Sequence, residues 1–162
     1  MLFGMGSLSL GELAGERMKV ALEANSVEDE HDCFSDNTHY SHFYNAKGIQ
    51  NIYLGEYQRV DGSMIQGPSL SKLINLQHSK LDITLTTALE QTMENLQLMV
   101  TRAEDNENPM KFDMMIAEGN VEGRKMVTAS IKSLAVQTGH IEEVARALQI
   151  EDLNPDNADH SF

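Results

Sequence analysis

Apolar residues return at every third or fourth position along almost the whole of this 162-residue chain. No segment alternates apolar and polar residues over the length of a strand, and the chain has only three prolines. The periodicity therefore predicts an all-α protein, folded as an antiparallel helical bundle of about four main helices with short ones between them. The clearest helical face is formed by Leu81, Leu85, Leu89, Met93, Leu96 and Val100.

The same periodicity sets the expected limits of the helices. Glu12 follows Ser9 by three residues, which is typical of a capping box at a helix start. The connection at 58–69 contains Gly and Pro and is expected to form turns. Helices are expected over about 9–24, 39–58, 69–79, 81–104, 109–117 and 119–149.

Length and composition limit the classes of function. Residues 1–150 are expected to form a single helical-bundle domain, followed by an acidic C-terminal tail at 151–162. With 25 acidic and 12 basic residues, the formal net charge is −13, so nucleic acid is excluded as the main partner. One cysteine cannot form an internal disulfide. Since no stretch of 18 apolar residues occurs, the chain is not expected to be transmembrane, and no signal peptide is recognised at its start.

The segment EDEHDCFSDNTH at 28–39 is the densest collection of ligating side chains in the sequence. It overlaps an expected loop at 25–38, and His39 and His42 project onto the inward face of the helix that follows. Carboxylates and imidazoles are donors that suit iron or zinc. We therefore predict a metal site here. The predicted ligands are Glu28, Glu30, His31, Asp36 and His39.

Arg17 gives this segment an alternative, structural role. Projected onto an ideal α-helix, Arg17 lies within the apolar stripe of 9–24, where a buried guanidinium needs a carboxylate partner. The acids of 28–36 could supply that partner. Other interpretations stay open: Arg17 extends its charged end to solvent, His39 and His42 are hydrogen-bonded core or capping groups, and the acidic run is a solvated loop.

A weaker candidate pair lies near the C-terminus. His140 and Glu143 are three residues apart on an expected helix and could bind one metal ion, although a solvent-facing pair is the commoner outcome at this spacing. Cys33, beside Phe34, is more typical of a small buried apolar residue than of a ligand. The sequence lacks a calcium-binding EF-hand loop, a His-Glu-x-x-His zinc motif, a Gly-x-Ser-x-Gly motif and a phosphate-binding loop.

Three strings of the sequence resemble the second half of the imelysin-like proteins. They are MGSLSLGELAGERMKVALE at 5–23, EDEHDCFSDNTH at 28–39 and NAKGIQNIYLGEYQ at 45–58. The resemblance is specific as far as about Tyr57 and looser to about residue 150. This family includes bacterial iron-regulated envelope proteins and a proposed insulin-cleaving metallopeptidase. The resemblance implies one half of an all-helical, two-bundle fold, a place in the bacterial periplasm or cell envelope, and a link to iron uptake.

The resemblance also implies roles for particular residues. In such proteins the matching positions line or support a cleft between the two halves. The family's Gly-x-His-x-x-Glu motif belongs to the other half, and it is not carried onto this chain, because Gly139 directly precedes His140. The expected supporting or ligand-binding residues are Glu16, Arg17, Cys33, Ser35, Asn37, Thr38 and His42.

Three functions are expected from these observations. The first is a non-enzymatic envelope protein that binds a metal ion, iron or zinc, or an iron-bearing ligand through the polar cluster at 16–42. The second is an imelysin-type metallopeptidase with a metal-activated water. The third is a structural or partner-binding bundle in which Arg17 and the acidic loop hold two helices together. A companion half, or a second copy in a homodimer, would complete the cleft.

Overall fold

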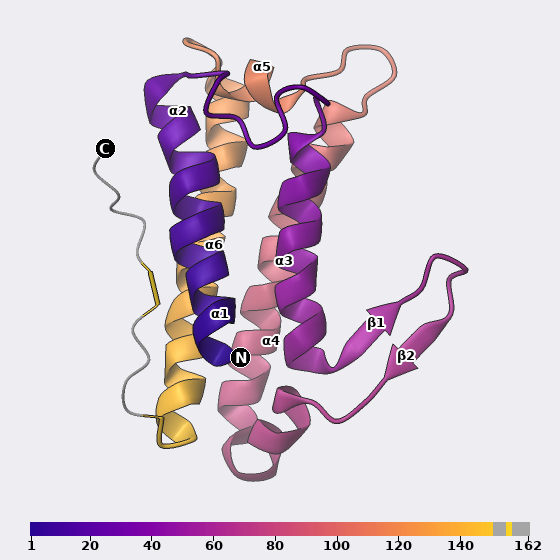
Figure 1. The fold of residues 1–162 in the computed structure, drawn as a ribbon, viewed down its shortest axis with the longest axis vertical. Coiled ribbons are helices and arrows are strands. Elements are labelled where there is room, and N and C mark those ends of the chain that lie inside the picture. The colour runs from indigo at the N-terminus through magenta and orange to yellow at the C-terminus, as the bar shows by residue number, and fades with distance from the viewer. Residues whose placement is uncertain (151–154, 157–162) are drawn as a thin grey trace.

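A computed structural model describes residues 1–150 and 155–156, and Figure 1 shows its fold. Within these residues four helical rods lie side by side with alternating chain direction, which confirms the predicted all-α antiparallel bundle. The predicted tail at 151–162 lies outside the described residues, except for Pro155 and Asp156. The elements are α1 (Leu2–Ser7), a π-helix η1 (Leu8–Val20), α2 (Ala21–Ala24), α3 (Thr38–Leu54), β1 (Glu56–Gln58), β2 (Met64–Gln66), α4 (Leu70–Ala103), α5 (Phe112–Ile116) and α6 (Val121–Ala147).

The bundle closes as a ring in which η1 packs on α6, α6 on α4, α4 on α3, and α3 again on η1. Its interior contains two clusters of apolar side chains. One cluster, near α5, includes the fully buried Leu96 and Phe112, and the other, near the N-terminus, includes Tyr53 and Leu85. Burying each large side chain of this kind contributes about 1.5–3 kcal/mol to folding, so these clusters are what holds the rods together.

The first rod differs from the expected helix at 9–24 in its start and in its type. It begins at Leu2, because Leu2 and Met5 already pack into a core cluster. The predicted capping box is therefore wrong. Ser9 lies inside the rod and is fully buried, where its hydroxyl donates to the Leu134 carbonyl at 3.1 Å. From Leu8 to Val20 the rod is a π-helix, whose i→i+5 hydrogen bonds shift its side chains away from their positions on an ideal α-helix.

Two glycines of this rod let Pro155 and Asp156 approach it closely. A Cβ atom on Gly6 would lie 2.9 Å from the Pro155 side chain, and one on Gly11 would lie 2.6 Å from that of Asp156. The Asp156 backbone N–H also donates to the Ser7 hydroxyl at 3.1 Å. These contacts place residues 155–156 against α1 and η1.

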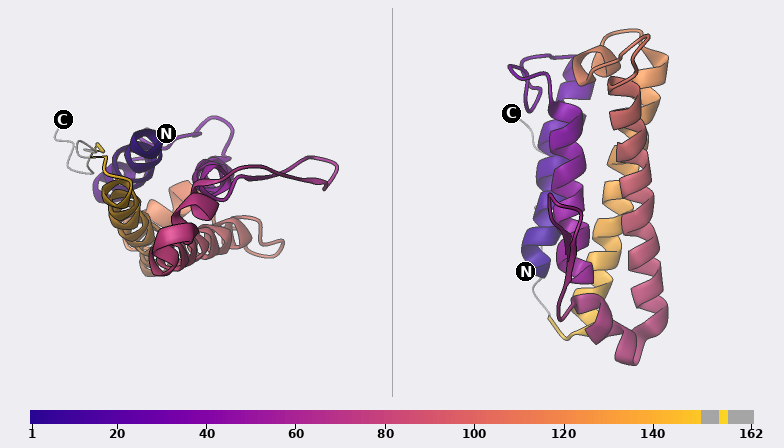
Figure 2. Two further views of the ribbon diagram at one scale, coloured as in Figure 1. Left: turned by 90° about the horizontal axis from the view of Figure 1, so that it is seen from below. Right: turned by 90° about the vertical axis from the view of Figure 1, so that its right-hand side faces the viewer.

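A β-hairpin, not predicted from the sequence, begins in the last residues of the helix expected at 39–58 and continues into the connection expected at 58–69. Strands β1 and β2 pair antiparallel, with Tyr57 opposite Ile65, and Figures 1 and 2 show the hairpin projecting from the bundle. Helix α3 ends at Leu54, four residues before the predicted limit, because Gly55 adopts a left-handed conformation with φ 66°.

The remaining helices agree more closely with the periodicity. The helices expected at 69–79 and 81–104 form one rod, α4, which is interrupted only at His78 by non-helical dihedral angles. Ser69 caps this rod by accepting a hydrogen bond from the Lys72 N–H at 3.0 Å. Asn120 caps α6 in the same way through the Gly123 N–H. None of the described helices combines the length and the apolar character that crossing a membrane requires.

Candidate functional site

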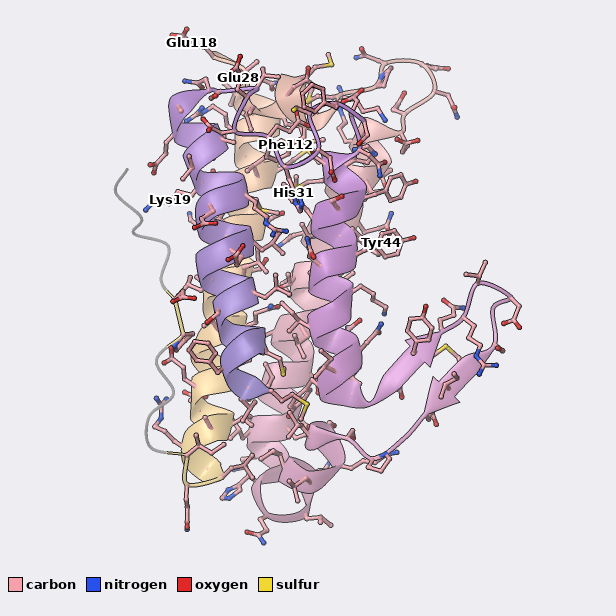
Figure 3. The ribbon with its side chains drawn as sticks, viewed as in Figure 1. Lys19, Glu28, His31, Tyr44, Phe112 and Glu118 are labelled. Carbon is pink, nitrogen blue, oxygen red and sulfur yellow. The ribbon has the colours of Figure 1, made fainter. Side chains whose placement is uncertain are left out.

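A groove opens between the first rod and α3, beside the loop that joins them. Figure 3 shows His31 lying between these two rods, with Phe112 behind the loop and Tyr44 pointing outward from α3. We call this surface the Arg17 groove. It is lined by Arg17 from η1, by His31 and Asn37 from the loop, and by Tyr40, Ser41, Tyr44 and Asn45 from α3.

Arg17 is not buried within an apolar stripe, as the helix projection predicted. Its side chain keeps 29% of its surface exposed, and its Nη2 lies 3.3 Å from Oε2 of Glu12. Of the two alternatives for Arg17, the pairing with the acids of 28–36 is not found among the described residues, and the charged end reaches solvent beside Glu12. Glu12 precedes Arg17 by five residues, the spacing at which a π-helix brings successive turns together. The π-helix thus turns the guanidinium toward the groove.

His31 lies against this guanidinium. The Nη1 atom of Arg17 is 3.3 Å from each of the two ring nitrogens of His31. Burial lowers the pKa of His31, and the positive charge of Arg17 lowers it further, while the charges of Asp32 and Glu12 act in the opposite direction. These causes favour the uncharged imidazole, whose one acceptor nitrogen can receive an N–H of Arg17.

His42 lies beneath His31, with ring centroids 6.0 Å apart. It is fully buried, and neither of its ring nitrogens has a hydrogen-bond partner among the described residues. Its ring meets the ring of Phe112 edge-on, at 4.8 Å between centroids. Burial, followed by the charges of His31, Arg17 and His39, lowers the pKa of His42 to about 3, so this imidazole stays neutral at physiological pH.

His39 points away from the groove, toward the end of α4. Its Nε2 lies 2.8 Å from Oε1 of Glu104, which also accepts a hydrogen bond from Lys111. Burial lowers the pKa of His39, whereas the hydrogen bond to Glu104 raises it. In this structure His39 links α3 to α4, which is the role of a satisfied core histidine, except that its Nδ1 has no partner among the described residues.

Glu30 is the buried acid of the loop, with 6% of its surface exposed. Its pKa is raised mainly by burial and also by the nearby charges of Asp113, Asp36 and Asp32, while a hydrogen bond with Thr38 lowers it. Its Oε1 has no partner among the described residues.

Asp32 ties the same loop to the start of α3. Its backbone N–H donates to the Thr38 hydroxyl at 3.0 Å, and its carboxylate accepts a hydrogen bond from Ser41. Its backbone carbonyl also accepts a hydrogen bond from the Ser35 hydroxyl at 3.3 Å. The loop that carries His31 is thus held in place from several directions.

The predicted metal ligands do not meet at one point. Glu28 and Asp36 are exposed, and Glu30 and His39 have the separate surroundings described above. In the described part of the chain, no three His, Cys, Asp or Glu side chains are placed to hold one metal ion. The arrangement does not fit a preformed metal centre, so we derive no chemical step through a bound metal. Metal binding by the set Glu28, Glu30, His31, Asp36 and His39 stays a prediction.

The other predicted residues have varied surroundings. Asn37 lines the groove at the N-cap position of α3, and Glu16 is half-buried on η1. Cys33 is a half-buried free thiol. On α6, Nδ1 of His140 lies 2.9 Å from Oε2 of Glu143, and neither residue belongs to the groove lining.

The side of α3 that faces the groove was not predicted from the sequence. The missed residues are Tyr40, Ser41, Tyr44 and Asn45. Together with Asn37 they recur at three- and four-residue spacing, which places them on one helical face. This spacing could have identified them, whereas the prediction rested on the inward face of the same helix.

Comparison with known families adds an independent finding. The family model described as Imelysin, peptidase M75, matches residues 1–141. This span includes every residue that lines the groove, together with all the rods except the end of α6. No match was found among curated protein sequences.

Proposed function

The chain belongs to the imelysin family, and from this premise we propose that it is a bacterial envelope protein of the periplasm, associated with iron uptake, whose Arg17 groove binds an iron-bearing ligand. One observation carries the proposal. In a chain with 25 acidic residues, the groove lining contains a guanidinium, an imidazole and neutral polar groups, and no carboxylate. Such a surface suits a ligand that presents negatively charged oxygen atoms.

A chelated iron fits this surface better than a bare metal ion. A cation bound to His31 would lie close to Arg17, and two unit positive charges 4 Å apart repel each other by about 4 kcal/mol at an effective dielectric constant of about 20. Glu12 offsets part of that repulsion. In an iron chelate, by contrast, the metal is already surrounded by oxygen ligands, and those oxygens accept hydrogen bonds from Arg17.

We assign no peptide-cleaving step to these residues. A zinc-type peptidase needs three protein ligands around the metal, an open coordination position and a nearby base. The described residues do not bring three such ligands together. We propose instead that residues 1–150 form one domain and supply one wall of the binding site. The facing wall would come from a companion half or from a second copy of the chain.

Elemental analysis after gel filtration tests this function. The purified protein is incubated with ferric citrate, with iron(II) chloride or with zinc chloride, and its mass in solution is measured in parallel. We expect the wild-type protein and Arg59→Met to retain stoichiometric iron from ferric citrate, and Arg17→Met to retain none. Arg59 is an exposed matched control on the hairpin.

Two results would contradict the proposal. One is that no iron is retained from ferric citrate. The other is that the protein binds free iron(II) or zinc ions stoichiometrically and that the folded double variant His31→Ala/His39→Ala does not. That result would place a direct metal site in the loop.

A further inference from the structure

The Arg17 groove is rich in hydrogen-bond donors. A guanidinium has five N–H donors, and in Arg17 the contacts to Glu12 and His31 occupy only Nη2 and Nη1. The hydroxyls of Tyr40 and Tyr44 and the side-chain amides of Asn37 and Asn45 line the same surface. The groove therefore offers several donors to one ligand.

The acids closest to the groove already have partners. Glu12 pairs with Arg17 at 3.3 Å, and Asp32 accepts the hydrogen bond of the Ser41 hydroxyl. Both carboxylates raise the proton affinity of His31, while Arg17 lowers it. A ligand carboxylate would therefore compete with Glu12 for the guanidinium, and this competition predicts that removing the charge of Glu12 strengthens binding.

The buried His42 is an independent sign of a ligand. Buried polar side chains are nearly always hydrogen-bonded, yet both ring nitrogens of His42 lack a partner among the described residues. The ring of His31, on the exposed loop, lies beside that of His42, with 6.0 Å between their centroids, and contacts Arg17 in the groove. A ligand that displaces this ring would meet an imidazole able to donate one hydrogen bond and accept another.

An aromatic platform adjoins these donors. Tyr40 and Tyr44 lie one turn apart on α3, with ring centroids at 6.2 Å and planes inclined by 18°. Tyr44 keeps 63% of its surface exposed. Paired rings of this kind contact the flat face of an unsaturated or aromatic group.

We propose that the groove recognises a free carboxylate on its ligand through Arg17 and holds a flat, unsaturated group beside it against Tyr40 and Tyr44. This inference rests on the proposed function and names the chemical class of the ligand. The oxygens of a carboxylate or a phosphate would both match the guanidinium fork. The aromatic platform favours a planar acid, because a phosphate has no flat apolar face to place there.

A titration without metal tests the inference. The purified protein, in buffer freed of metal by a chelating resin, is titrated with sodium benzoate, sodium acetate or inorganic phosphate, and the NMR signals of Arg17 Nε–H and of the His31 ring are followed. We expect benzoate to bind more tightly than either acetate or phosphate. Arg17→Met should weaken benzoate binding about tenfold or more, as expected for a lost charge-assisted pair, while Arg59→Met leaves it unchanged.

Glu12→Gln keeps the test decisive even if Arg17→Met fails to fold. Removing the competing carboxylate should tighten benzoate binding several-fold, and a damaged fold cannot mimic a gain in affinity. The inference is overturned if benzoate leaves the Arg17 signal unchanged, if both arginine variants bind alike, or if phosphate binds more tightly than benzoate. Benzoate binding together with no iron retained from ferric citrate would support this inference and reject the proposed function.

Discussion

The bundle contains two buried polar centres that are built in opposite ways. Near the N-terminal end, the hydroxyl of Tyr53 donates to Asp82 at 2.9 Å, and the amide of Asn75 donates to the other oxygen of Asp82, also at 2.9 Å. Beside the groove, neither ring nitrogen of the buried His42 has a hydrogen-bond partner in the described residues. We call the first centre saturated, because its polar atoms have hydrogen-bond partners, and the second unsaturated, because its polar atoms lack them. Polar atoms that are all paired specify packing, whereas buried polar atoms without partners can bind a ligand.

This contrast predicts the largest loss of stability at the saturated centre. Asp82→Ala would leave the hydroxyl of the fully buried Tyr53 without its partner and would also remove the hydrogen bond of the exposed Asn75 amide. We expect the free energy of unfolding to fall by about 2–4 kcal/mol, measured by urea denaturation. Asp61→Ala, on the exposed hairpin turn, is the control and should change it far less. Similar values for the two variants would contradict the structural role of Asp82.

The unsaturated centre predicts a dependence of stability on pH. The pKa of His42 is about 3 in the folded protein, whereas an unfolded histidine has its model value of 6.5. Below pH 6.5 the unfolded chain therefore binds a proton that folded His42 does not, so stability falls as pH falls toward 3. The expected slope is about 1.4 kcal/mol per pH unit over this range.

Comparison with a variant isolates this contribution of His42. The pKa values of His31 and His39 are also lowered, and the raised pKa of Glu30 acts in the opposite direction. We therefore compare urea denaturation of the wild type with that of His42→Leu at pH 7 and at pH 5. The stability difference between the two proteins should change by about 2 kcal/mol across that interval. An unchanged difference would show that His42 titrates normally.

His42→Leu also tests the cost of an unpaired polar group at pH 7. Replacing a buried imidazole that has no partner by an apolar side chain of similar size should stabilise the protein by about 1 kcal/mol. Ile49→Val, also on α3 and fully buried, is a control expected to lose about 1 kcal/mol. If His42→Leu is destabilised as much as Asp82→Ala, then His42 is structurally satisfied and the contrast between the two centres is wrong.

The fold could be predicted from the sequence wherever core packing imposes the α-helical period, as in α4 and α6. The prediction failed in η1, because a π-helix obeys a different period and brings Arg17 to the groove and to Glu12. It also failed at the hairpin, whose strands have three residues each and bury no alternating face.

Sequence analysis found only part of the site. Arg17 was identified by its place on the projected helix, His31 by its ligating imidazole, and Asn37 by the resemblance to the imelysin-like proteins. The surroundings of His39 could not be predicted, because its partner Glu104 is 65 residues away and on another rod. Likewise, the apolar setting of His42 depends on Phe112, which only the tertiary fold brings to it.

The smallest effect is expected at the weaker candidate pair, which belongs to neither centre. His140 and Glu143 are partly exposed on α6 and lie one turn apart, so their pairing costs little to break. We expect His140→Ala to change the free energy of unfolding by less than about 0.5 kcal/mol and to leave iron retention from ferric citrate unchanged. Urea denaturation measures the free energy of unfolding, and elemental analysis after gel filtration measures the iron retained. Loss of iron in His140→Ala, with the fold intact, would move the site from the groove to α6, because no contact in the described structure joins His140 to Arg17 or His31.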